Sequence, residues 1–127
     1  MKTIISTPKA PSAIGPYNQA TSFEKLVFTS GQIALDPQTM EIVNGGVKEQ
    51  TKQVMENLKA VLEEANSSFE NVLKTTCYLS DMDNFVAFNE IYGEYFNPQT
   101  APARSTVAVK TLPKNVLVEV DLIAFKK

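Results

Sequence analysis

The segment Val116–Phe125 constrains the fold more than any other part of the chain, because it is apolar on both sides of a strand. Side chains alternate between the two faces of a strand. One face would carry Val116, Val118, Val120, Leu122 and Ala124, and the other Leu117, Ile123 and Phe125 beside Glu119 and Asp121. A strand of this kind is buried on both faces. We therefore expect it inside a sheet whose two faces are both covered.

The length of 127 residues suits a single domain spanning 1–127. Apolar residues make up 43% and charged residues 20%, as in ordinary soluble globular proteins. One cysteine excludes a disulfide within the chain, which favours a reducing compartment. The first residues offer an apolar stretch of only Ile4-Ile5, and no later run approaches the length of a membrane span. We expect a cytoplasmic protein with no membrane partner.

The chain contains no histidine, which removes whole classes of chemistry. Ser-His-Asp and Cys-His nucleophile systems are excluded, and zinc sites lose their commonest ligand. Proton transfer near neutral pH must then use a carboxylate, tyrosine, lysine or backbone group with a shifted pKa. The net charge is −2 and no basic run is present, which argues against nucleic acid as the main partner.

Patterning predicts the element order β-β-β-α-β-α-β-β. The strands expected are Lys2–Ser6, Asn18–Phe23, Leu26–Gln32, Val72–Leu79, Ser105–Lys110 and Val116–Phe125. One helix should lie between Gly46 and Asn66 and the other over Asn84–Phe96. This order indicates an α+β sheet with hairpins at both ends and two helices on one face. Two helices leave the second face uncovered, so we expect other copies of the chain to cover it in a homo-oligomer.

Three residues are candidates for chemistry. Glu119 interrupts the most apolar strand, where burial would raise its pKa and make it a proton shuttle, unless it faces water or pairs with a lysine. Arg104 follows Ala101-Pro102-Ala103 and would offer its planar fork to a small carboxylate or phosphate, unless it is a surface or ion-paired arginine. Tyr17 ends a proline-rich loop and would either cover a pocket or pack structurally.

Two further positions are less decisive. Ser30-Gly31 ends a strand, and the glycine would either admit a ligand close to the backbone or form a bulge. Cys77 has no basic sequence neighbour and is interpreted as a small buried hydrophobic residue rather than a nucleophile.

Several blocks of the sequence, in one order, resemble the RidA (YjgF/YER/UK114) family of enamine/imine deaminases. The blocks are Ala13–Ala20, Thr29–Ile33, Gln50–Leu58, Phe88–Tyr92, Pro102–Val107, Leu112-Pro113 and Leu117–Val120. The resemblance runs from about Ile4 to Ala124. It implies a chorismate-mutase-like α+β fold with a six-stranded mixed sheet, and a homotrimer with clefts between neighbouring subunits. It also implies hydrolysis of imines that arise from enamines such as 2-aminoacrylate, giving 2-oxo acids and ammonia without a metal or organic cofactor.

The same resemblance assigns roles to the candidates. Arg104 would hold the substrate carboxylate, with a hydrogen bond from the backbone at Gly31. Glu119 would position the attacking water and pass protons to the departing nitrogen. Tyr17 would close the cleft, and Ser30 and Asn89 are weaker pocket candidates.

One position departs from the family pattern. Many members have cysteine two residues after the arginine, whereas this chain has Thr106, so a thiol there is not essential to this protein. Thr106 would keep any main-chain contact to the ligand and reshape the pocket with its side chain. Two other functions stay open: a 2-oxo-acid-binding regulatory module without turnover, and an RNA-acting or chaperone-like protein.

Overall fold

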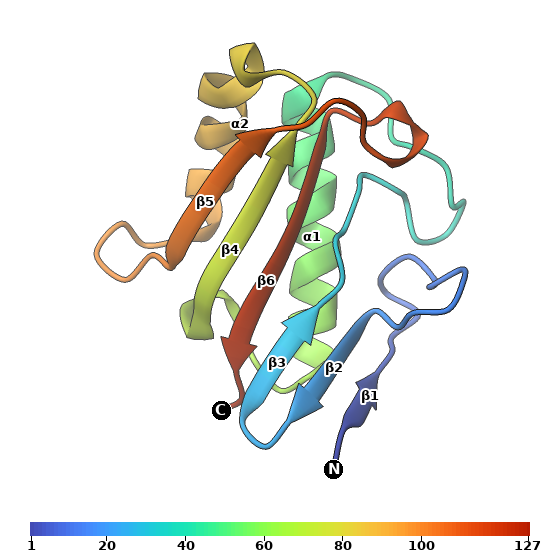
Figure 1. Cartoon of the computed structure of the whole chain (residues 1–127), viewed down its shortest axis with the longest axis vertical. Helices are drawn as coiled ribbons and strands as arrows, with labels where there is room; N and C mark the ends of the chain where they lie inside the picture. Colours follow the sequence, from blue (N-terminus) through green and yellow to red (C-terminus); the bar gives the residue numbers. More distant parts are fainter.

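The elements follow one another in the expected order in a computed structural model of residues 1–127 (Figure 1). The strands are β1 Thr3–Ile5, β2 Ala20–Phe23, β3 Leu26–Thr29, β4 Val72–Leu79, β5 Ala103–Ala108 and β6 Val118–Phe125. The helices are α1 Val47–Glu64 and α2 Phe85–Tyr92, and four short 3₁₀ turns are η1 Phe69–Asn71, η2 Met82–Asn84, η3 Gly93–Tyr95 and η4 Pro113–Asn115. Neither helix combines the length and the hydropathy that a membrane-spanning segment requires.

The six strands form one mixed sheet in the order β1-β2-β3-β6-β4-β5. Only β4 and β5 pair in parallel, and all other neighbours are antiparallel. The α+β sheet with two helices on one face is thus confirmed, but the expected C-terminal hairpin is wrong. β6 enters the sheet between β3 and β4 instead of pairing with β5. The reason is burial, since the strand that is apolar on both sides takes a central place.

Both helices lie behind the sheet in Figure 1, and the core fills the space between. Helix α1 turns an apolar side to the sheet at helical spacing, with Val54, Leu58 and Val61 fully buried. The helix-facing residues of β6 alternate as expected, from Val118 to Ala124. The opposite face of the sheet carries exposed large apolar side chains, among them Phe23, Phe28, Val107 and Phe125. Neither helix covers that face.

Element ends differ from expectation where tertiary contacts decide them. Helix α2 stops at Tyr92 and continues only as the 3₁₀ turn η3, because Gly93 favours the helical state less than other residues do. Strand β5 starts at Ala103, two residues early, since its parallel pairing with β4 begins at Lys74. The second strand starts at Ala20 and the third ends at Thr29, although Gln32 still pairs with Val120 in an isolated bridge.

Candidate functional site

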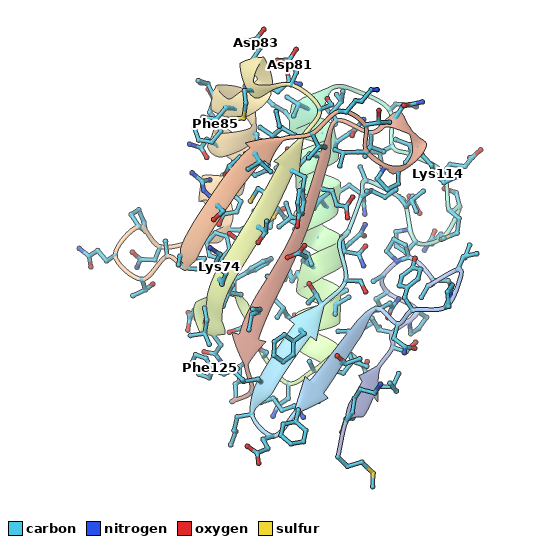
Figure 2. All side chains as sticks on the ribbon, viewed as in Figure 1. Lys74, Asp81, Asp83, Phe85, Lys114 and Phe125 are labelled. Atoms are coloured by element: carbon cyan, nitrogen blue, oxygen red, sulfur yellow. The ribbon has the colours of Figure 1, made fainter.

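A cavity of about 380 Å³ opens beside the first residues of β6. A volume of this order is typical of small-molecule sites. Three predicted site residues line it, namely Tyr17, Gly31 and Glu119. The rest of the lining is Pro11, Ser12, Ile14, Gln19, Gln32, Ile33, Leu35, Met40, Pro113 and Lys114. Figure 2 shows Lys114 on the loop before β6, at the opposite end of that strand from Phe125.

Glu119 is the only carboxylate in the cavity lining. It points to the sheet face away from the helices, is half-buried, and has no lysine or arginine partner, since the one salt bridge of the chain joins Lys48 and Glu90. Burial raises the pKa of Glu119, and the nearby negative charge of Asp121 raises the pKa further. The lysine-paired alternative is therefore wrong, and burial makes Glu119 a weaker acid than a carboxyl group in water.

Gly31 gives Glu119 the space for its carboxyl group. A Cβ atom on Gly31 would collide with Glu119 Oε2 and lie 2.8 Å from Cδ and 3.1 Å from Cγ. The N–H groups of Ser30 and Gln32 donate to Gln19 O and Val120 O at 2.9 Å each, whereas the Gly31 N–H has no acceptor in the chain. Gly31 therefore leaves a free backbone donor next to the carboxyl group, which favours the interpretation of close ligand approach.

Tyr17 stands at the rim of the cavity with 50% of its surface exposed. Its loop is fixed by Gln19, which is buried. The Gln19 amide nitrogen lies within hydrogen-bond distance of Thr7 O (3.0 Å), Ala10 O (3.2 Å) and Pro11 O (2.8 Å), and its oxygen accepts from the Thr7 N–H at 2.7 Å. Sequence reasoning missed Gln19, because the carbonyls it binds become its neighbours only when the loop folds back.

Asp121 and Tyr78 form a second polar group beside Glu119, also missed from the sequence. Tyr78 lies opposite Glu119 in the register of β4 and β6, and its hydroxyl donates to Asp121 Oδ2 at 3.1 Å. Burial raises the pKa of Asp121, while the Tyr78 hydrogen bond opposes that rise. Two half-buried carboxylates thus share one sheet face at positions two residues apart.

Arg104 lies in a different hollow, lined also by Asn89, Tyr92 and Pro102. Its Nη1 donates to Asn89 Oδ1 at 2.6 Å, and its guanidinium carbon lies 4.8 Å from the centre of the Tyr92 ring. It also lies 5.4 Å from the centre of the Phe85 ring. No carboxylate of the chain pairs with Arg104. The guanidinium is therefore oriented by a neutral amide and aromatic rings, and its charge stays available to an anion.

Thr106 and Cys77 lie on the same side of the sheet as Arg104. Thr106 Oγ1 is buried and has no hydrogen-bond partner. Cys77 is fully buried, and burial raises the pKa of its thiol to about 11. The interpretation of Cys77 as a small buried hydrophobic residue is confirmed, because a thiol of this pKa is uncharged at neutral pH.

One chain does not bring Arg104 and Glu119 together. Paired residues of neighbouring strands point to the same face, and Cys77 is paired with both Thr106 and Val120 in the buried core. Arg104, two residues before Thr106, shares that helix-side face, whereas Glu119, next to Val120, points to the other. Arg104 and Glu119, to which the resemblance assigns roles at one site, do not meet within a single chain, because β4 separates β5 from β6 and the two side chains leave the sheet on opposite sides.

No group of three or more cysteine and acidic side chains lies close enough together to hold a metal ion. Four functional groups line the cavity. They are the Glu119 carboxyl group with its raised pKa, the free N–H of Gly31, the phenol of Tyr17 and the amino group of Lys114. Such a set can bind an anion, orient a water molecule and exchange a proton.

Comparison with known proteins identifies relatives along the whole chain. Residues 7–126 match the model of a family described as endoribonuclease L-PSP. A RutC family protein of Synechocystis sp. is 58% identical over 95% of this chain and 94% of its own length. The mouse 2-iminobutanoate/2-iminopropanoate deaminase is 45% identical over 98% of this chain and 91% of its own length. A solved structure of a conserved Rid family protein from Yersinia pestis superposes with a TM-score of 0.95 at 43% identity, covering 98% of this chain and 99% of that one.

Proposed function

We propose that this chain, which belongs to the RidA (YjgF/YER/UK114) family, hydrolyses reactive enamine and imine intermediates to 2-oxo acids and ammonia. Substrates of this class include 2-aminoacrylate and its tautomer 2-iminopropionate. Relatives named 2-iminobutanoate/2-iminopropanoate deaminase, at 45% identity in mouse and 42% in human, support the assignment of this reaction class.

The observation that carries the proposal is the close approach of the Glu119 carboxyl group to the backbone of Gly31. A half-buried carboxyl group, its pKa raised by burial, occupies the space that a Cβ on Gly31 would take, and the N–H of Gly31 has no partner in the chain. Hydrolysis of an imine needs a group that takes a proton from water and returns one to nitrogen, which suits a carboxyl group with a raised pKa. The Gly31 N–H would donate to the substrate and hold it against that group.

The anchor for the substrate carboxylate is Arg104, supplied by a second copy of the chain. Arg104 and Glu119 point to opposite faces of one sheet, so a complete site needs Arg104 of one copy beside Glu119 of a neighbour. The uncovered apolar face of the sheet supports association, because a surface of this kind usually marks an interface. We propose a homotrimer with sites between subunits, in which Tyr17 closes the cleft against bulk water.

The reaction proceeds by addition and elimination. Glu119 takes a proton from a water molecule as the water oxygen bonds to the imine carbon, and the π electrons move to nitrogen, which takes up a proton from the solvent. Glu119 then protonates the amino group of the tetrahedral intermediate. The C–N bond breaks, ammonia leaves with the bonding pair, and the Glu119 carboxylate accepts the hydroxyl proton to give the 2-oxo acid and then releases that proton to the solvent. Because the imine is already electrophilic, positioning and proton transfer suffice.

The test uses Arg104→Ala and Glu119→Gln, each assayed for acceleration of 2-iminopropionate decay. Each variant alone should lose the activity while keeping the oligomer. Mixing the two after subunit exchange should restore activity, since random assembly puts both intact groups together at about one site in four. Activity that stays absent in the mixture contradicts sites shared between subunits. Full activity in either single variant contradicts the assigned roles.

A matched control distinguishes Arg104 from the cation in the Glu119 cavity itself. Lys114 lines that cavity, on the loop before β6. If Arg104 is the anchor, Lys114→Gln should leave the KM for 2-iminopropionate close to the wild-type value, while Arg104→Ala abolishes measurable turnover. The reverse result would move the anchor to Lys114 and make a single chain sufficient.

Two other functions give distinct outcomes in the same assays. Saturable binding of 2-oxobutyrate without faster ammonia release favours a regulatory module. Cleavage or salt-dependent binding of single-stranded RNA favours the activity in the description of the family model, endoribonuclease. The net charge of −2 and the acidic groups Glu119 and Asp121 on the uncovered face speak against an RNA surface there.

A further inference from the structure

Helix α1 carries three amide side chains, Gln50, Gln53 and Asn57, at spacings of three and four residues. This spacing places neighbouring members of the row side by side on the helix surface. Gln50 and Asn57 are buried, and Gln53 is half-buried. A buried amide costs folding free energy unless its polar atoms are hydrogen-bonded, so the partners of these side chains show what the row does.

The Asn57 amide binds the segment that follows Gly31. Its Nδ2 donates to Ile33 O at 3.2 Å and to Leu35 O at 3.0 Å. No other group of the chain donates to Leu35 O. The Gln53 Nε2 donates to Asn57 Oδ1 at 2.8 Å, which directs the nitrogen of the Asn57 amide toward the two carbonyls. Because Asn57 is only 1% exposed, water does not replace these bonds.

The sheet by itself holds the segment after Gly31 at one point only. The continuous pairing of β3 with β6 ends at Phe28, and beyond it Gln32 pairs with Val120 in one isolated bridge. A single bridge leaves the chain free to turn about that point. The two bonds from Asn57 lie further along the same segment and remove this freedom, which fixes the direction of the backbone at Gly31.

The chain that leads to Glu119 is bonded to the same helix. Gln50 Oε1 accepts from the Leu117 N–H at 2.9 Å, two residues before Glu119. Residues 50 and 57 lie about 10 Å apart along the helix axis, so one rigid element is bonded to both segments that supply the site. Helix α1 lies on the opposite face of the sheet from Glu119 (Figure 1). These bonds therefore form within one chain, whether or not a second copy covers the other face.

We propose that Asn57 is a positioning residue for the candidate site and that Gln53 orients it. Through the main chain of Ile33 and Leu35, the two amides keep the Gly31 backbone in place beside the Glu119 carboxyl group. This inference rests on the proposed deaminase function. It adds to that function two residues that touch neither the substrate nor the reacting atoms.

The kinetic test replaces the donor at position 53 by an acceptor and by another donor. Gln53→Glu presents carboxylate oxygens to Asn57 Oδ1, so the Asn57 amide should rotate and turn its oxygen toward the Ile33 and Leu35 carbonyls. Gln53→Lys keeps an N–H donor at the same half-buried position. We expect kcat/KM for 2-iminopropionate to fall about 10- to 100-fold in Gln53→Glu, the size expected for a displacement of up to about 1 Å at a reacting group. Gln53→Lys should stay close to wild type, and equal rates in the two variants overturn the inference.

A second pair of variants separates positioning from stability. Asn57→Leu and Ser67→Ala each remove a buried donor to a main-chain carbonyl, and Ser67 Oγ donates to Phe125 O at 2.7 Å, at the far end of β6 from the cavity. Both variants should lower Tm. At a temperature where both are folded, only Asn57→Leu should lower kcat/KM, by about 100-fold. Wild-type kcat/KM in folded Asn57→Leu overturns the inference.

A spectroscopic measurement needs no turnover. Protein labelled with ¹⁵N-glycine gives amide signals from five glycines, and Gly31→Ala assigns the signal of Gly31. This signal should shift in Gln53→Glu and stay in place in Gln53→Lys, while the signal of Gly93 stays in place in both. A Gly31 signal that does not move in Gln53→Glu overturns the inference, whether or not the protein hydrolyses imines. A Gly31 signal that moves, in a protein whose wild type does not accelerate imine decay, overturns the deaminase function and supports the positioning of Gly31.

Discussion

Substitution of Gly31 by alanine tests the geometry at Glu119 directly. The new Cβ would collide with Glu119 Oε2 and lie 2.8 Å from Cδ, so the carboxyl group must rotate away. A displacement of about 1 Å at a reacting group costs about 100-fold in rate, equivalent to about 2.7 kcal/mol of transition-state stabilisation. We expect kcat/KM for 2-iminopropionate to fall by about this factor in Gly31→Ala, measured as acceleration of imine decay.

The same substitution should leave stability nearly unchanged, which separates it from a folding defect. The atoms that must move are the end of a side chain, and Gly31 does not have the positive φ found at Gly15 and Gly45. Alanine also lowers the conformational entropy of the unfolded chain, which is worth about 0.4–1 kcal/mol where the backbone allows it. Gly46→Ala is the matched control, because a Cβ there meets only Glu49 Oε1, at 3.8 Å, and Gly46 lines neither the Glu119 cavity nor the Arg104 hollow. Wild-type kcat/KM in Gly31→Ala, or a Tm far below that of the wild type, would refute the reasoning.

Two further predictions follow from the groups around the cavity. The negative charge of Asp121 helps to raise the pKa of Glu119, so Asp121→Asn should lower that pKa and move the acidic limb of the pH profile of kcat/KM to lower pH; a limb that stays in place contradicts the coupling. Gln19→Leu removes the hydrogen bonds that hold the proline-rich loop and leaves buried polar groups unpaired. This should cost about 3 kcal/mol of folding free energy and lower Tm by about 10 °C. Trypsin should then cleave faster after Lys9, and a Tm and cleavage rate equal to wild type would show that Gln19 does not hold the loop.

The sequence of β6 predicted that this strand lies inside the sheet, but it did not predict which strands pair with it. Apolar residues on both sides indicated a central strand, and β6 does lie between β3 and β4. The short connection through Pro113 suggested a hairpin with β5, but β5 instead follows β4 in parallel through α2. Strand pairing depends on contacts with distant parts of the chain, and the local sequence of a strand carries little information about which strands become its neighbours.

The site shows the same division between local and long-range information. Tyr17, Gly31 and Glu119 were predicted, each from its residue type in a local context, and one cavity gathers them. Gln19 was missed because its partners are main-chain carbonyls of a loop, which any sequence supplies. Met40 was missed because methionine gives no signal for a positive φ, a conformation normally inferred from glycine or asparagine.

Arg104 and Glu119 lie on opposite faces of one sheet, and this separation also explains why a neutral amide and an aromatic ring, rather than a carboxylate, orient Arg104. A guanidinium paired with a carboxylate inside its own chain would have to exchange that partner for the substrate, and the exchange would reduce affinity. Arg104 is held instead by the Asn89 amide and the Tyr92 ring, which fix its direction and leave its charge uncompensated. Glu119 likewise has no cation beside it, and its raised pKa depends on that. If the two groups were neighbours in the free chain, each would neutralise the other and the pKa of Glu119 would fall. In the oligomer that we propose, Arg104 of a second copy would reach Glu119, and a substrate carboxylate bound to that guanidinium would offset its positive charge beside the acid.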